Sequence, residues 1–125
     1  MTMEYYTLIV DDDERNIFAL TAIFKSKGLK YLTAVDGREA IRMLEENPQI
    51  NLVLLDMMMP VTDGFEALRQ IRMHEKLKEM PVIALTAKAM LGDREKCLEA
   101  GANGYVSKPV NVAELFNEID KLFKK

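Results

Sequence analysis

Several features that mark secreted and membrane proteins are missing from the sequence. Its 125 residues include one cysteine, Cys97, which excludes an intramolecular disulfide framework and suits a reducing compartment. No apolar run approaches the roughly 20 residues that a membrane span needs. The N-terminal MTMEYYTLIV has neither the basic region nor the small-residue cleavage site of a signal peptide. We therefore expect a cytoplasmic protein with no membrane partner.

An excess of basic residues is also missing. The formal net charge of −3 at pH 7 argues against nucleic-acid binding through bulk electrostatics. A length of 125 residues and a hydrophobic fraction of 49% are ordinary for one globular domain with a real core. We expect a single domain over residues 1–125 that has no direct nucleic-acid partner.

Short β-prone runs alternate with segments of helical periodicity along the whole chain. The apolar runs lie at residues 6–10, 31–35, 52–55, 82–85 and 105–106. Several of them are continuous rather than alternating, which is typical of strands covered on both faces. Five strands alternating with five helices predict a doubly wound α/β fold, with a parallel sheet between two layers of helices.

Some residues in the helical segments have a plain structural interpretation. In the last segment we expect an inward-facing stripe formed by Val112, Leu115, Ile119 and Leu122. Cys97 is expected to be a small buried hydrophobic residue. His74, the only histidine, is expected to be a solvated helix-end residue rather than a phosphohistidine. Asp63 and Gly64 are expected to form the turn and start of the third helix.

Acidic residues follow two of the expected strands. Asp11, Asp12 and Asp13 come directly after the first run, and Asp56 follows the third. Taken alone, an aspartate cluster after a strand is most often turn and N-cap chemistry. In open parallel sheets, however, ligands bind at the carboxyl ends of the strands. Clustered carboxylates without nearby His or Cys suit a hard cation such as Mg²⁺, which would also relieve their mutual repulsion.

A hydroxyl and an ammonium group reach the same edge. Thr86 ends the fourth run, and Lys108 follows the fifth. Each is unremarkable alone, since a threonine fits a strand end and most lysines are solvated. Beside a metal-bound aspartate, however, they are the groups that a phosphoryl group needs. An aspartate can itself be the nucleophile and form an acyl phosphate.

These residues lie in four motifs whose order resembles the receiver domain of two-component response regulators. The motifs are IVDDD, LLDMMMPVTDGFEALRQIR, PVIALTAKAM and EAGANGYVSKPV. The resemblance covers about residues 5–124. The sequences LTAKAM and GANGYVSKPV are similar to those of receivers in hybrid kinases and phosphorelays. It implies a flavodoxin-like (βα)5 fold with a five-stranded parallel sheet in the order 2-1-3-4-5.

The resemblance also implies the roles of the acidic residues. Asp56 would be the phospho-acceptor, taking a phosphoryl group from a phosphohistidine of a sensor histidine kinase or histidine phosphotransfer protein. Asp12, Asp56 and the backbone carbonyl of Met58 would bind Mg²⁺. Asp11 would lie beside them in the acidic pocket without direct metal contact. Asp13 falls outside this acidic pair and is expected to cap the first helix.

Other roles implied by the resemblance concern the switch. Thr86 and Lys108 would contact the phosphoryl group, and the Lys108–Pro109 peptide would be cis. Thr86 and Tyr105 would transmit phosphorylation to the face made by the fourth helix, fifth strand and fifth helix, which would bind an unknown downstream protein target. Ala87 would leave access to the phosphoryl oxygens, and Met58 and Lys88 would tune the lifetime of the phosphoryl group.

Two other classes of protein fit parts of this pattern. A phosphohydrolase of the haloacid-dehalogenase type carries a second carboxylate two residues after its nucleophile, where this chain has Met58, and it needs length for a cap domain. A flavodoxin-type cofactor binder has a phosphate loop rich in Ser, Thr and Gly, whereas this one is acidic. We therefore expect a switch rather than a turnover enzyme. This switch would catalyse only its own phosphorylation and slow autodephosphorylation. The start MTMEYY and the absence of a linker favour a complete single-domain protein, and a receiver cut from a larger sensor kinase is the alternative.

Overall fold

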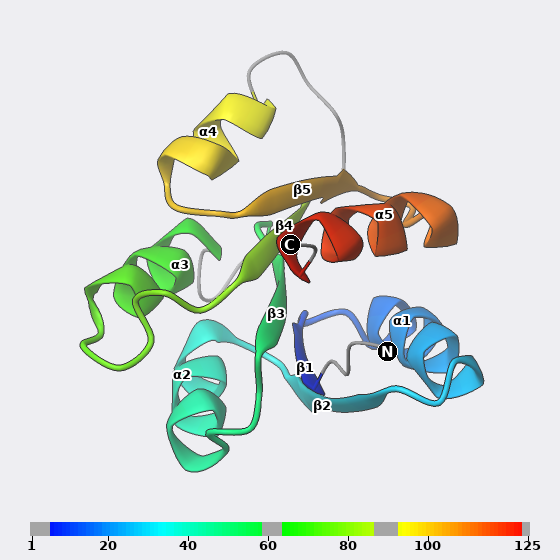
Figure 1. Cartoon of the computed structure of the whole chain (residues 1–125), viewed down its shortest axis with the longest axis horizontal. Coiled ribbons are helices and arrows are strands. Elements are labelled where there is room, and N and C mark those ends of the chain that lie inside the picture. The colour runs from blue at the N-terminus through cyan, green and yellow to red at the C-terminus, as the bar shows by residue number, and fades with distance from the viewer. Residues whose placement is uncertain (1–5, 59–63, 87–92, 124–125) are drawn as a thin grey trace.

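The computed structural model describes residues 6–58, 64–86 and 93–123, in which strands and helices alternate along the chain. The strands are β1 (Tyr6–Val10), β2 (Lys30–Ala34), β3 (Leu52–Asp56), β4 (Val82–Thr86) and β5 (Gly104–Ser107). The helices are α1 (Glu14–Ser26), α2 (Gly37–Glu46), α3 (Gly64–Met73), α4 (Asp93–Glu99) and α5 (Val112–Phe123). All strand pairs are parallel, and the sheet order is β2-β1-β3-β4-β5, so the predicted fold class and strand order are confirmed (Figure 1).

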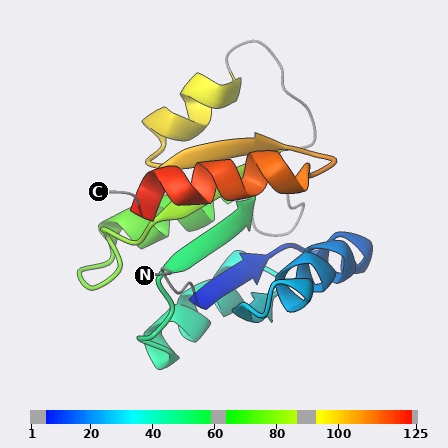
Figure 2. The same ribbon diagram turned by 45° about the vertical axis from the view of Figure 1, so that its right-hand side comes forward.

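The helices form two layers, one on each face of the sheet (Figures 1 and 2). One layer is α1 and α5, and the other is α2, α3 and α4. Successive strand residues alternate between the two cores: Leu8 and Val10 of β1 pack under α2 and α3, whereas Ile9 packs under α1 and α5. We call these two clusters the α2–α3 core and the α1–α5 core. Among the described residues, no helix has the length and apolar character needed to cross a membrane.

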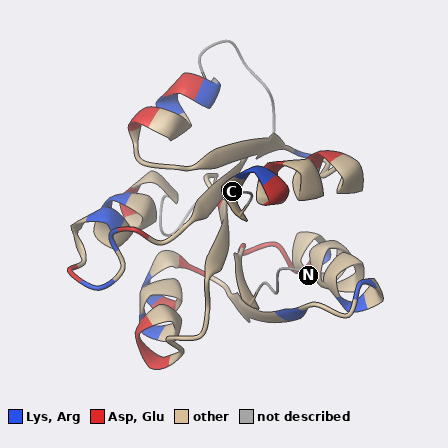
Figure 3. Cartoon of the chain, viewed as in Figure 1, with Lys and Arg blue, Asp and Glu red and all other residues tan. Residues whose placement is uncertain are grey.

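Charge is distributed unevenly over this architecture. Lysine, arginine, aspartate and glutamate are spread over the helices, whereas the strands carry few of them (Figure 3). The segment that leaves β1 is acidic (Figure 3). The parallel strands place their carboxyl ends along one edge of the sheet, so this acidic segment lies at the edge where ligands bind in such folds (Figure 2).

The helical predictions are confirmed in part. Cys97 is buried in the α2–α3 core, as predicted. In α5, Leu115 and Ile119 are buried, but the prediction for Val112 was wrong, since it is 41% exposed. Val112 is the first residue of α5, and the packed stripe begins one turn later. His74 lies just after α3 and is not freely solvated, because its Nε2 is 2.9 Å from Oε2 of Glu45.

A threonine hydroxyl is buried in the first strand of the sheet. Thr7 in β1 is fully buried, and its hydroxyl oxygen has no hydrogen-bond partner in the described part of the chain. It lies two residues before Ile9, on the side of the sheet that packs under α1 and α5. A buried hydroxyl without a partner loses its hydration and gains no hydrogen bond in return.

We therefore expect Thr7→Val, which keeps the side-chain shape, to raise the free energy of unfolding by about 1 kcal/mol. Urea unfolding followed by circular dichroism measures the change. Thr33→Val is a matched control in the edge strand β2, where the threonine is only half-buried, and should change stability less. A loss of stability in Thr7→Val would contradict the assignment of an unsatisfied hydroxyl.

Candidate functional site

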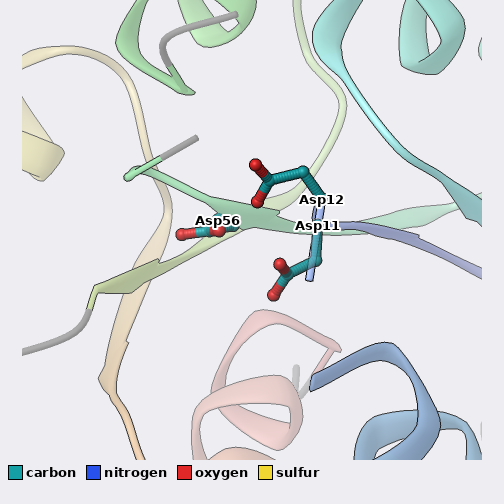
Figure 4. A group of neighbouring side chains, drawn as sticks. All are labelled: Asp11, Asp12 and Asp56. Atoms are coloured by element: carbon teal, nitrogen blue, oxygen red, sulfur yellow. The ribbon is translucent and has the colours of Figure 1, made fainter. Parts of the chain in front are cut away.

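Three carboxylates meet at the carboxyl ends of β1 and β3. Asp11 and Asp12 directly follow β1, and Asp56 is the last residue of β3. These strands are hydrogen-bonded neighbours, so their ends lie side by side. Each aspartate offers a carboxylate oxygen, and the three oxygens lie within 4.8 Å of one another. In Figure 4 the Asp12 carboxyl lies above the backbone of this segment and the Asp11 carboxyl below it, with Asp56 to their left.

Lys108 joins two of these carboxylates. Its Nζ is 3.2 Å from Oδ2 of Asp11 and 3.3 Å from Oδ1 of Asp56. The alternation of side chains explains the encounter, because Asp11, Asp56 and Lys108 each lie two positions beyond a strand residue of the α1–α5 core. The three side chains therefore project toward the same helix layer.

The charge at this edge is not balanced by Lys108 alone. When ionised, Asp11, Asp12 and Asp56 carry three negative charges against the one Lys108 ammonium, an excess of two within this group of described side chains. Burial raises the pKa of Asp11, and the nearby Asp56 carboxylate raises it further. The N–H of Asp13 and the ammonium of Lys108 lower it only in part. Grouped oxygen ligands with an excess of two negative charges fit a hard divalent cation such as Mg²⁺.

The third aspartate of the acidic run has a different role. Asp13 is the N-cap of α1, and its Oδ1 accepts a hydrogen bond from the N–H of Arg15 at 2.9 Å, as predicted. That same N–H donor lowers the pKa of Asp13. The N–H of Asp13 donates to Oδ1 of Asp11 at 2.9 Å, so the cap also helps to hold the buried carboxylate.

The backbone after Asp56 is held from two sides. The N–H of Met57 donates to the carbonyl of Leu85 at 2.9 Å, which continues the pairing of β3 with β4. The N–H of Met58 donates to Oδ1 of Asp56 at 3.0 Å. The Met57 side chain is buried, whereas that of Met58 is 63% exposed. The predicted metal contact of the Met58 carbonyl stays a prediction.

Thr86 and Tyr105 lie on the other face of the sheet. Ala84, a member of the α2–α3 core, pairs in register with Tyr105, and Thr86 lies two residues beyond Ala84. Thr86 is buried, and its carbonyl accepts the N–H of Lys108 at 2.6 Å. The Oη atom of Tyr105 is buried and finds no hydrogen-bond partner among the described residues.

The remaining sequence predictions near the site have mixed outcomes. The Lys108–Pro109 peptide is cis, as predicted. Gly64 is the first residue of α3, which confirms it as the helix start. Ala87, Lys88 and Asp63 lie outside the described residues. Sequence reasoning missed the close approach of Gly64 to the Asp56 backbone, because no local pattern signals a contact between separate segments.

Comparison with known proteins places this architecture in a class of signalling domains. The response regulator receiver domain matches residues 7–120, and the chain belongs to this family of phosphorelay switches.

Individual relatives agree with this membership. The chain is 32% identical to the polar-differentiation response regulator DivK of Brucella ovis, over 90% of each chain. Its fold is similar to the receiver domain of sensor histidine kinase PA1611 from Pseudomonas aeruginosa, which has a magnesium ion in its active-site cleft, with 36% identity, a TM-score of 0.86 and coverage of 98% and 100%. It is also similar to a chain of the complex of Ypd1 with the Ssk1 receiver domain from Saccharomyces cerevisiae, with 29% identity, a TM-score of 0.85 and coverage of 97% and 90%.

Other relatives are much longer than this chain. The chain spans 13–14% of the length of the histidine kinases that it matches from Arabidopsis thaliana and Oryza sativa. The likeness to these kinases therefore concerns one part of each protein.

The raised pKa of Asp11 predicts the effect of removing its charge. Asp11→Asn keeps an oxygen that can accept the Asp13 N–H, and in EDTA at pH 7 it should raise the thermal unfolding midpoint by a few degrees, roughly the scale of 1 kcal/mol. A carboxyl with a raised pKa favours folding below its ordinary pKa, and that contribution is lost as the pH rises through the raised value. The increase in the unfolding midpoint produced by Asp11→Asn should therefore disappear at acidic pH.

Mg²⁺ and a second variant provide the controls for Asp11→Asn. Asp12→Asn removes an exposed charge from the same cluster and should change the midpoint less. Adding Mg²⁺ should narrow the difference between wild type and Asp11→Asn, since the wild type gains the stronger ligand set. An unchanged or lower midpoint in EDTA would contradict a destabilising Asp11 charge.

Proposed function

We propose that Asp56 is the phospho-acceptor of this receiver domain and that the acidic pocket binds Mg²⁺. The observation that supports this most is the grouping of three carboxylates within 4.8 Å at the strand ends, with Lys108 in contact with two of them. Asp56 lies at the centre of this arrangement. Its carboxylate lies beside those of Asp11 and Asp12, and it also contacts the Lys108 ammonium.

Asp12 and Asp56 would hold the cation, together with the backbone carbonyl of Met58. Asp11 is buried and engaged by Lys108 and the Asp13 N–H, which suits a supporting role beside the ion. When bound, Mg²⁺ supplies positive charge that offsets the phosphoryl oxygens. The PA1611 receiver, which contains a magnesium ion in its active-site cleft, supports the choice of metal.

The transfer itself would form a bond between a carboxylate oxygen of Asp56 and phosphorus. The bond between phosphorus and the partner's imidazole nitrogen breaks, and its electron pair stays on that nitrogen, which takes a proton from solvent. Lys108 lies close enough to Asp56 to neutralise the oxygens of the arriving group. The Thr86 hydroxyl would donate a hydrogen bond to the same group.

The output of the switch would be a change on the α4–β5–α5 face. Thr86 and Tyr105 share one face of adjacent strands, so a movement of Thr86 toward a phosphoryl group opens space next to Tyr105. The phosphate donor would be a sensor histidine kinase or a histidine phosphotransfer protein, and the complex of Ypd1 with the Ssk1 receiver supports the second of these. A separate protein would read the remodelled face. We place the protein in the cytoplasm.

We assign the domain to switching rather than turnover. Met58, two residues beyond the acceptor, carries no carboxylate that could act as a general acid or base, and its side chain extends toward solvent. The phosphoryl group should therefore remain on Asp56 long enough for a partner to respond.

Incubation with Mg²⁺ and acetyl phosphate tests the acceptor. We expect intact-protein mass spectrometry to show the gain of one phosphoryl group, which Asp56→Asn and EDTA abolish and Asp12→Ala lowers at least tenfold. Asp13→Asn is the matched control, because asparagine also caps helices and should leave the gain unchanged. Continuous release of phosphate would indicate a hydrolase, and no mass gain would indicate an inert binding module.

The lifetime of the phosphoryl group provides a separate test. Met58→Asn introduces an amide that can orient a water molecule toward the acyl phosphate, so the decay rate after donor removal should rise several-fold. Met73→Asn replaces another exposed methionine at the far end of α3 and should leave the decay unchanged. Equal decay in wild type and Met58→Asn would show that this position does not control hydrolysis.

A further inference from the structure

The first residue of α3, Gly64, lies directly against the backbone that carries Asp56. Gly64 is buried, and a Cβ atom placed on it would approach the Asp56 carbonyl oxygen and the Met57 Cα far more closely than the 3.0 Å that real Cβ atoms keep. The same Cβ would lie 3.1 Å from the Asp56 carbonyl carbon. All three atoms belong to the main chain, so no change of side-chain rotamer can relieve the overlap.

The facing backbone has little freedom to move aside. The Met57 N–H is engaged by Leu85 of β4, and the Met58 N–H is engaged by the Asp56 carboxylate. The Met57 side chain is anchored in the α2–α3 core. A side chain at position 64 would therefore either break these contacts or push α3 away from the end of β3.

The inner face of α3 is graded in size along the helix. Gly64 and Ala67 lie nearest the site end, and Leu68 and Ile71 follow toward the other end, with all four buried. The bulky residues hold α3 on the sheet, while the glycine allows its first turn to touch the strand end. The atoms that a Cβ at Gly64 would meet belong to Asp56 and Met57.

We propose that Gly64 is a positioning residue for Mg²⁺ binding and phosphoryl transfer. By letting α3 contact the Asp56–Met57 backbone, it fixes the Asp56 carboxylate and the Met58 carbonyl relative to Asp11, Asp12 and Lys108. This inference rests on the proposed function of Asp56. Ordinary contact with a Cβ begins at 3.4 Å, so a methyl group at position 64 requires a displacement on the order of 1 Å. Metal ligands tolerate only about 0.2 Å, and a 1 Å misplacement can cost roughly a hundredfold in rate.

The test compares Gly64→Ala with Gly28→Ala. Gly28 follows α1 with φ of 69° and has no atom within 4 Å of a built Cβ, so alanine there strains the backbone without touching the site. For each variant we measure the Mg²⁺ dissociation constant from amide NMR signals, the initial rate of phosphorylation by acetyl phosphate, and stability in urea.

We expect Gly64→Ala to weaken Mg²⁺ binding at least tenfold and to slow phosphorylation roughly a hundredfold. Gly28→Ala should lose stability yet keep both values within twofold of wild type. A folded Gly64→Ala protein with wild-type Mg²⁺ affinity and rate would overturn the proposal. Phosphorylation of wild type away from Asp56, or none at all, would instead refute the proposed function, and the Mg²⁺ affinities would still decide the role of Gly64.

A second variant covers a loss of folding. Gly64→Ala is also made in the Thr7→Val background, which we expect to be more stable. If the double variant folds, its Mg²⁺ affinity and phosphorylation rate are compared with those of Thr7→Val alone, with the same expected losses. If it remains unfolded at low temperature, Gly64 serves the fold rather than the site, and the proposal is overturned.

Discussion

Repulsion between carboxylates at the ends of β1 and β3 is the constraint around which this domain is arranged. Asp11 and Asp56 are buried, and together with Asp12 they bring three oxygens within 4.8 Å. An arrangement of this kind is unfavourable without nearby positive charge. Lys108 supplies part of that charge, and its backbone is tied to β4 through the Thr86 carbonyl. A bound divalent cation, as proposed above, would offset the residual negative charge.

Much of this arrangement could be predicted from the sequence, because it follows from strand periodicity and topology. Continuous apolar runs alternating with helical segments predicted the parallel sheet, and the sheet predicted that Asp56 and Lys108 would share an edge. The N-cap role of Asp13 followed from its place before a helix. These inferences depend only on local pattern and on where parallel strands end.

Other features depend on contacts that no local pattern contains. The burial of Asp11 beside an exposed Asp12 depends on which face of the sheet each side chain enters. The exposure of Val112 depends on where α5 first touches the sheet, and the pairing of His74 depends on α2 lying alongside. The Gly64 contact is of the same kind, since two short segments must be brought within van der Waals distance before a missing Cβ matters.

The buried hydroxyl of Tyr105 has a consequence for how easily the domain changes shape. The hydroxyl has no partner among the described residues, and a buried hydroxyl left unpaired costs about 1–3 kcal/mol relative to a hydrated one. Any rearrangement of the α4–β5–α5 face that exposes this oxygen to water recovers part of that free energy. Under the output role proposed for this face, phosphorylation would therefore need to supply less free energy than it would if the Tyr105 hydroxyl were hydrogen-bonded.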